Sequence, residues 1–170
     1  RGGSKAIHEK ARPDGILTVS APRNHFPLID GAKRYLLLAG GIGVTPMMAM
    51  IATLGARGAD WRMHYCTRSA EKTAFCDRLQ PFVAAGKVVL HHDGGDPKKG
   101  LDISTTLKDV EPGTHLYYCG PSGFMAAVAQ AAKHYLTGNE LALDPATAIK
   151  IVADHSEAAS AWSILLEVGT

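Results

Sequence analysis

Two groups of small and polar residues in this sequence have the types and spacing of a nucleotide-binding site. The first is the run Gly40-Gly41-Ile42-Gly43-Val44-Thr45-Pro46, which follows the apolar segment 35–39. Glycines let a pyrophosphate approach the backbone, and the N-terminus of a following helix attracts its negative charge. The run is not the usual G-x-G-x-x-G, because Pro46 stands at the last glycine position. A tight turn from strand to helix, without a ligand, is the alternative interpretation.

The second group consists of residues that follow two other apolar segments. Thr67, Arg68 and Ser69 supply hydroxyls and a cation where the ribose of an adenosine, or its phosphate, would lie. Cys119, Gly120 and Pro121 come at the end of a later segment, and the carboxyl ends of parallel strands share one edge of the sheet. The alternatives are a solvated loop at Arg68 and a buried, unreactive thiol at Cys119.

Other candidate sites carry weaker signals. Gly2, Gly3 and Ser4 precede a short predicted helix and could form an anion-binding nest. His91 and His92 suggest a metal site, but neighbouring strand residues point to opposite faces, so we predict no metal there. The three cysteines are Cys66, Cys76 and Cys119; their spacing fits neither zinc nor an iron–sulfur cluster, and a sparse, odd set favours a reducing, cytoplasmic location.

The elements that must position these residues alternate along the chain. We predict strands at 35–39, 61–67, 87–92 and 115–119. We predict four helices in this part of the chain. The first starts near Thr45, which would be its N-cap, and the second spans 70–80 and ends at Pro81. The third spans 101–108, and the fourth follows Pro121. The last helix carries an apolar stripe at Phe124, Val128, Ala131 and Tyr135. The alternation predicts an α/β fold, with an open parallel sheet covered by helices on both faces.

The ends of the chain fit this pattern less well. A helix at 4–10, a strand at 16–20 and a linker to residue 27 are too short for a core of their own, so we divide the chain into residues 1–27, 28–138 and 139–170. Further strands are expected at 149–153 and 163–168. The abrupt start at Arg1, without a secretory signal, suggests a fragment.

Composition excludes several classes of protein. The chain has 170 residues, of which 46% are hydrophobic, and its net charge is +2. These values exclude a disordered tail and argue against nucleic acid or a membrane as the main partner. The uncharged stretch 35–56 is long enough to span a membrane, but Gly40, Gly41, Gly43 and Pro46 divide it into a strand and a helix.

The motifs together resemble the phthalate dioxygenase reductase family. The matching segments are 40–47, His64-Tyr65-Cys66-Thr67-Arg68-Ser69, Thr73-Ala74-Phe75, His91-His92-Asp93 and Tyr118-Cys119-Gly120-Pro121, in the order and spacing of that family. Its members are reductase components of Rieske-type aromatic-ring dioxygenases and O-demethylases. The resemblance, over residues 1–138, implies a ferredoxin reductase-like, nicotinamide-binding domain preceded by the end of a flavin-binding β-barrel.

The resemblance also implies an activity and its residues. NADH, with NADPH left open, would donate electrons through FMN or FAD to a Rieske-type oxygenase. Gly2, Gly3 and Ser4 would help to hold the flavin phosphate, and Cys119 would border the nicotinamide and tune hydride transfer. The pyridine nucleotide would lie against three segments, formed by Gly40, Gly41, Ile42, Gly43, Thr45 and Pro46, by Thr67, Arg68 and Ser69, and by Cys119, Gly120 and Pro121.

The sequence also departs from the family. The flavin motif Arg-x-Tyr-Ser and the cluster motif Cys-x4-Cys-x2-Cys are both absent, so we expect the 2Fe-2S cluster only in a domain outside this chain. A non-catalytic nucleotide-binding module and a reductase of free flavin remain alternatives. We further expect that Gly43→Val weakens NADH binding with little loss of stability.

Overall fold

The computed structural model describes residues 3–16, 18, 20, 21, 24, 26–111 and 113–138, and its chain forms two units. One unit combines Arg1–Pro27 with Lys150–Thr170, and the other is Leu28–Ile149. The first contains helix α1 (Gly3–Lys10), which confirms the helix predicted at 4–10. The described residues of the expected strand 16–20 are not in a strand, and no described segment of that unit offers them a pairing partner. The strands expected at 149–153 and 163–168 lie outside the described residues.

The second unit is built on four parallel strands. They are β1 (Arg34–Gly40), β2 (Trp61–Thr67), β3 (Val88–His92) and β4 (Thr114–Cys119), in the order β3-β2-β1-β4. β1 lies in the centre between β2 and β4, and every residue from Tyr35 to Gly40 is buried. A continuous apolar run suits such a strand because both of its faces are covered. The predicted parallel sheet is therefore confirmed.

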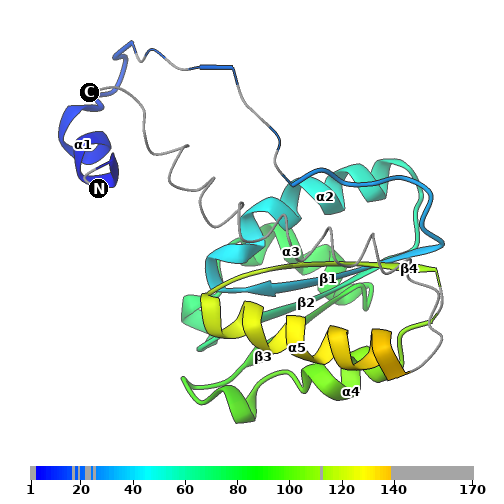
Figure 1. Cartoon of the computed structure of the whole chain (residues 1–170). Helices are drawn as coiled ribbons and strands as arrows, with labels where there is room; N and C mark the ends of the chain where they lie inside the picture. Colours follow the sequence, from blue (N-terminus) through cyan, green and yellow to red (C-terminus); the bar gives the residue numbers. More distant parts are fainter. Residues whose placement is uncertain are drawn as a thin grey trace. The chain divides into compact units, whose positions relative to one another are not determined.

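Helices cover both faces of this sheet. Figure 1 shows α2 (Val44–Ala56) and α3 (Cys76–Ala84) on one side, and α4 (Ile103–Lys108) and α5 (Ser122–Gly138) on the other. Short 3-10 turns precede or join them at Gly41–Gly43, Ala70–Lys72 and Pro97–Lys99. The uncharged stretch 35–56 is thus β1 and α2, and within the described residues no helix is long and apolar enough to span a bilayer.

The core lies between the sheet and its helices. Leu37 and Leu38 project to opposite faces of β1 and both are 0% exposed, so each contributes about 1.5 to 3 kcal/mol by burial. The Trp61 ring on β2 packs edge-on against Phe82 of α3, with ring centroids 5.3 Å apart. On α5, Val128 is buried as its place in the predicted stripe requires, and Ala132 is buried beside it.

The start of α2 near Thr45 was predicted correctly, but the capping role of Thr45 and the extent of the next helix were wrong. Thr45 is not an N-cap, because α2 begins at Val44, directly after the 3-10 turn. The Thr45 hydroxyl instead donates to the Ile42 carbonyl over 2.9 Å. The helix expected at 70–80 is interrupted: the chain makes a 3-10 turn at 70–72 and then a left-handed residue, Phe75 (φ 61°). Pro81 lies inside α3 instead of ending it. The interruption changes the direction of the chain before α3, and Phe82 of α3 packs on Trp61.

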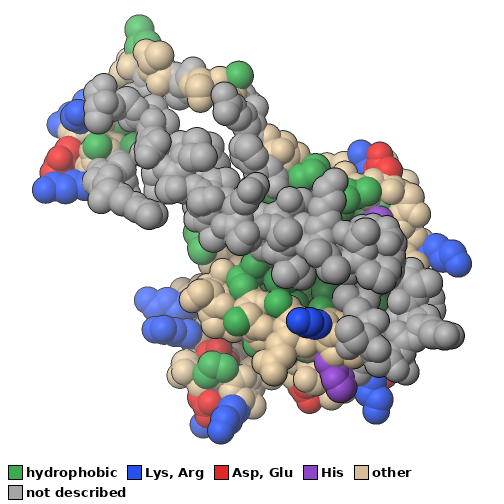
Figure 2. Space-filling model, in the orientation of Figure 1, with side chains coloured by type: hydrophobic (Ala, Val, Ile, Leu, Met, Phe, Trp, Pro, Cys, Tyr) green, Lys and Arg blue, Asp and Glu red, His purple; other side chains and the backbone are tan. Residues whose placement is uncertain are grey.

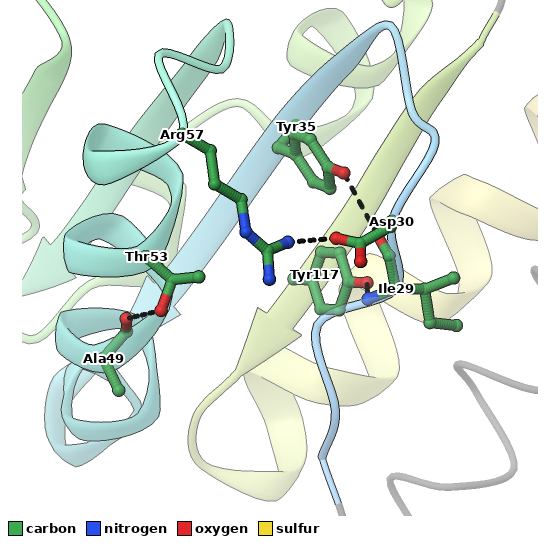
Figure 3. Close-up of polar contacts among 7 residues, drawn as sticks. All are labelled: Ile29, Asp30, Tyr35, Ala49, Thr53, Arg57 and Tyr117. Carbon is green, nitrogen blue, oxygen red and sulfur yellow. Dashed lines mark hydrogen bonds and ion pairs between the residues drawn. The ribbon is translucent and has the colours of Figure 1, made fainter.

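The segment that leads into β1 is fixed by two tyrosines of the sheet (Figure 3). The Ile29 amide donates to the Tyr117 hydroxyl over 2.8 Å, and the Tyr35 hydroxyl donates to the Ile29 carbonyl over 3.1 Å. Beside them Arg57, which follows α2, forms an ion pair with Asp30. The backbone N–H and C=O of Ile29 are thus both hydrogen-bonded to hydroxyls of buried tyrosines, which ties this segment to the sheet.

On the face drawn in Figure 2, Lys and Arg side chains lie at several separate places, with Asp and Glu near some of them. Arg34 illustrates the pattern, because it pairs with both Asp60 and Glu111 over 2.6 and 2.9 Å. This distribution agrees with the net charge of +2.

A histidine pair on the sheet makes stability depend on pH. His64 Nδ1 lies 2.9 Å from His91 Nε2, and the two rings are stacked, with centroids 5.1 Å apart and 24° between their planes. Burial, then the charges of His91 and Arg62, lower the pKa of His64 from 6.5 to about 4. Between pH 6.5 and pH 4, His64 is therefore protonated in the unfolded chain but remains neutral in the folded chain. The free energy of unfolding consequently decreases as the pH falls from 6.5 toward 4.

We expect this loss to be measurable by urea unfolding between pH 7 and pH 4.5. The full shift corresponds to about 3 kcal/mol, and solvent around the partly exposed ring reduces the expected loss to about 1 to 2 kcal/mol. His64→Gln should remove most of that loss, whereas the control His8→Gln, at an exposed position, should leave it unchanged. Equal pH dependence in wild type and His64→Gln would assign the effect to other groups.

Candidate functional site

The loops after β1 and β4 meet where the order of the strands reverses. From β1 the chain moves outward through β2 to β3, and then returns to place β4 on the other side of β1. Such a switch point leaves a crevice at the carboxyl ends of the two central strands, which is where open α/β sheets bind ligands. Ala39 pairs with Cys119 there, so Gly40–Gly43 and Cys119–Pro121 are neighbours. The structure thus brings together two of the three segments predicted to hold the nucleotide.

Gly43 closes this junction by direct backbone contact. A Cβ atom on Gly43 would lie 1.9 Å from the Cys119 carbonyl oxygen and 2.7 Å from the Gly120 nitrogen. Backbone atoms cannot move aside as a flexible side chain would, so no larger residue fits. The expectation that Gly43→Val spares stability is therefore wrong: this glycine packs one loop against the other, and its missing side chain leaves no space for a ligand.

Gly41 and Ile42 form the open part of the same turn. Gly41 has a φ of +51°, and nothing lies within 4 Å of the position that a Cβ would take. Ile42 beside it is 66% exposed, an unusual position for a large apolar side chain. The backbone at Gly41 and the Ile42 side chain are therefore both accessible to a ligand.

Phe124 forms a wall beside the glycines at the ends of β1 and β4. A Cβ on Gly40 would lie 3.0 Å from the Phe124 ring, and one on Gly120 would lie 2.8 Å from the ring and 3.0 Å from the Gly40 Cα. Pro121 also borders Gly40, at 3.2 Å. Gly40 and Gly120 are thus required for close packing between the strand ends and α5.

The first turn of α2 supplies the electrostatic part of the site. Thr45 and Pro46 lie in this turn, which contains no acidic residue, so the partial positive charge of the helix N-terminus is not cancelled. The Thr45 hydroxyl donates to the Ile42 carbonyl and holds the shape of the turn. An anion beside Gly41 would therefore lie at the end of a 13-residue helix.

Cys119 is a half-buried thiol at the end of β4. Burial raises its pKa above the ordinary value of 9.0, and the Gly120 amide offsets only part of that rise. The group is therefore a neutral thiol at pH 7, not a nucleophilic thiolate. This agrees with the predicted role of bordering a ligand. Cys66, at the end of β2, is also protonated, because burial raises its pKa to about 11.

The third predicted segment, at the end of β2, divides into an exposed and a buried part. Arg68 is exposed and Ser69 half-buried, so both can meet a ligand. Thr67 is 6% exposed, and its hydroxyl lies 2.8 Å from that of Thr73 and 3.0 Å from His92 Nδ1. Its side chain shapes the turn instead of facing a ligand, which corrects the prediction for that residue.

The N-terminal candidates belong to the other unit. Gly2 lies outside the described residues, and Gly3 and Ser4 begin α1. Within the described residues, no group of three or more His, Cys, Asp or Glu side chains could hold a metal ion, and Cys66, Cys76 and Cys119 are all free. His64 and His91 do contact each other, but as a hydrogen-bonded pair.

The sequence analysis missed three residues that build the site. From the sequence, Phe124 was predicted only to belong to the apolar stripe of the last helix. Thr73 was noted only as part of a motif shared with the family, and His92 only as part of a metal site that we rejected. A signal for the hydroxyl pair was present, because the alternation of β2 places Thr67 on the same buried face as Trp61 and Met63. A threonine at such a position needs a polar partner.

Comparison with known proteins identifies relatives of this chain. Residues 19–141 match the family model described as dimethylamine monooxygenase subunit DmmA-like, N-terminal domain. The reductase subunit of the tert-butanol monooxygenase / tert-amyl alcohol desaturase of Aquincola tertiaricarbonis is 52% identical over 135 residues, which are 79% of this chain and 40% of that protein. The vanillate O-demethylase oxidoreductase of Pseudomonas putida is 46% identical over 133 residues, 78% of this chain and 42% of that protein.

A solved structure agrees with these relatives. Phthalate dioxygenase reductase superimposes on this chain with a TM-score of 0.64 at 42% identity, over 70% of this chain and 37% of that one. It is described as a modular structure for electron transfer from pyridine nucleotides to [2Fe-2S]. The chain therefore spans about 40% of the length of these relatives. Their shared fold is the parallel sheet described above.

Proposed function

The chain belongs to the DmmA-like family of oxygenase reductases, together with phthalate dioxygenase reductase, and we propose that its second unit binds a pyridine nucleotide for electron transfer to an oxygenase. NADH is the favoured donor. The electron acceptor would be a flavin, FMN or FAD, and the final partner a Rieske-type oxygenase or demethylase. Three unpaired cysteines fit a cytoplasmic location for such a protein.

The observation that carries this proposal is the open backbone at Gly41. Gly41 follows the end of β1 and begins the turn that leads to the N-terminus of α2, at the switch point of the sheet. A pyrophosphate at Gly41 would be held by the helix end, and its two arms would extend toward the two other predicted segments. Arg68 and Ser69 would hold the adenosine ribose, while Cys119 and Gly120 would border the nicotinamide.

This chain's residues bind and orient, and the bound groups supply the redox chemistry. A flavin accepts a hydride from the nicotinamide and passes on single electrons. The neutral Cys119 thiol fits that task, because hydride transfer needs no protein nucleophile and no proton at this position. The three cysteines do not fit an iron–sulfur cluster, which takes four thiolates, so no step through a cluster is assigned to this chain.

Calorimetric titration of the chain with NADH tests the proposal. We expect saturable binding to a single site. Absence of binding to both NADH and NADPH would overturn the proposed function. Binding without reduction of flavin by NADH would favour a regulatory nucleotide-binding module, and reduction of free flavin without a bound one would favour a flavin reductase.

Arg68→Ala tests the adenosine end of the site. A guanidinium pairs bidentately with a phosphate but only hydrogen-bonds a hydroxyl, so the loss of affinity should be about tenfold for NADPH and smaller for NADH. Titration of the variant with both nucleotides measures the difference. Arg62→Ala, at an exposed position of β2, the strand that precedes Arg68, is the control and should change neither affinity. Equal losses would show that Arg68 does not contact the 2′ position.

A further inference from the structure

The segment that links β2 to α3 is short and polar, yet its backbone is closely held. The Ser69 carbonyl accepts from the Lys72 amide over 3.1 Å, and the Arg68 carbonyl accepts from the Gly94 amide over 2.9 Å. These bonds fix the peptide groups on both sides of the Ser69 side chain. They do not explain why hydroxyl groups lie beneath the same turn.

Two buried threonines and a histidine form a continuous chain of hydrogen bonds under this turn. Thr67 and Thr73 are 6% and 8% exposed, and their hydroxyl oxygens are 2.8 Å apart. The Thr73 hydroxyl donates to the Ser69 carbonyl over 2.9 Å. On the other side, His92 Nδ1 of β3 lies 3.0 Å from the Thr67 oxygen. The chain of bonds therefore runs from β3, through the end of β2, to Ser69.

Counting protons gives the chain a direction. Each hydroxyl has one hydrogen, and that of Thr73 is used on the Ser69 carbonyl. The hydrogen of Thr67 goes either to the Thr73 hydroxyl, 2.8 Å away, or to the Ser69 carbonyl, 3.2 Å away. With its hydrogen used in either way, Thr67 can only accept from His92, which requires a proton on Nδ1 of that ring. In both arrangements the chain of bonds ends at Ser69.

We propose that His92, Thr67 and Thr73 are positioning residues that hold the Arg68–Ser69 turn in the shape that receives the adenosine half of the nucleotide. The inference rests on the proposed function, since it deepens the same site. Valine has the shape of threonine and would fill the same buried space, so packing alone does not require these hydroxyls. What the hydroxyls add is a fixed direction for the Ser69 peptide, next to the side chains that would contact the ribose.

The test compares Thr73→Val, which removes the hydroxyl, with Thr73→Ser, which keeps it. ADP-ribose, which lacks the nicotinamide, is the probe and its binding to the full chain is measured by calorimetry. We expect Thr73→Val to weaken ADP-ribose binding about fivefold, and Thr73→Ser to restore the wild-type value. The matched control is Thr53→Val in α2, which removes a hydroxyl bonded to the Ala49 carbonyl over 3.1 Å and should leave binding unchanged.

The outcomes separate this inference from the function on which it rests. If wild type does not bind ADP-ribose or NADH, the proposed function fails. If wild type binds and Thr73→Val binds equally well, or if Thr73→Ser loses as much as Thr73→Val, the positioning role is overturned. If Thr73→Val does not fold, 15N NMR of the wild-type chain at pH 8 provides a second test, because it shows which ring nitrogen of His92 carries the proton. A proton on Nδ1 supports the chain of hydrogen bonds, and a proton on Nε2 overturns it.

Discussion

Replacing Gly43 by alanine should lower the free energy of unfolding by about 3 kcal/mol or more, because a single methyl group would collide with backbone on both sides of a peptide bond. The added Cβ would lie 1.9 Å from the Cys119 oxygen and 2.3 Å from its carbonyl carbon. Relief requires the β1 loop and the end of β4 to separate by more than 1 Å, which disrupts packing at the switch point. For a domain stable by about 5 to 15 kcal/mol, this is a large fraction of the total.

Two other glycines provide matched controls for this experiment. Gly55, within α2, has nothing within 4 Å of its missing Cβ, so Gly55→Ala should raise stability by up to about 1 kcal/mol. Gly41 is also open but has a φ of +51°, so Gly41→Ala should cost about 1 kcal/mol and still fold. Urea unfolding of the three variants measures the order. Equal stability of Gly43→Ala and wild type would show that the two loops are not in contact.

Cys119→Ser should slow hydride transfer from NADH to flavin by about tenfold to a hundredfold in a flavin-containing protein that includes this chain. The thiol borders the predicted nicotinamide position, and a displacement of about 1 Å there costs on the order of a hundredfold in rate. Serine has a shorter bond to its oxygen and a stronger need for hydrogen bonds, so it changes that contact. Stopped-flow spectroscopy of flavin reduction measures the effect, while reoxidation by an artificial acceptor should remain unchanged.

Cys66→Ser is the control for the thiol chemistry. Cys66 is the second-last residue of β2, Cys119 is the last residue of β4, and burial raises the pKa of both thiols. It lies on the strand face opposite to Thr67, away from the adenosine residues. Normal flavin reduction in Cys119→Ser would return this residue to the role of a buried cysteine at the end of a strand. The nicotinamide would then have to be placed elsewhere.

The sequence predicted what depends on local pattern. Strand 61–67 was predicted with the bounds that the structure shows, because alternation and β-branched or aromatic side chains mark it clearly. The glycine-rich turn between β1 and α2 was also predicted, since a strand, a glycine-rich turn and a helix form a recognisable unit.

What the sequence did not reveal depends on contacts between distant residues. The collision at Gly43 is with Cys119, which is far away in the sequence, so no local pattern separates this glycine from the open Gly41. The same holds for the break at Phe75, where packing of α3 on Trp61 overrides a helical pattern. The positioning role of His92 required knowing that β3 lies beside β2.

Amide NMR of the chain during titration with NADH tests whether a pyridine nucleotide binds at the carboxyl edge of this sheet. We expect saturable shifts at residues 40–45, 68–73 and 119–121, with Leu54 and Ala132, distant in α2 and α5, unchanged. Shifts confined to the face that carries His64 and His91, or no saturable shifts, would contradict it.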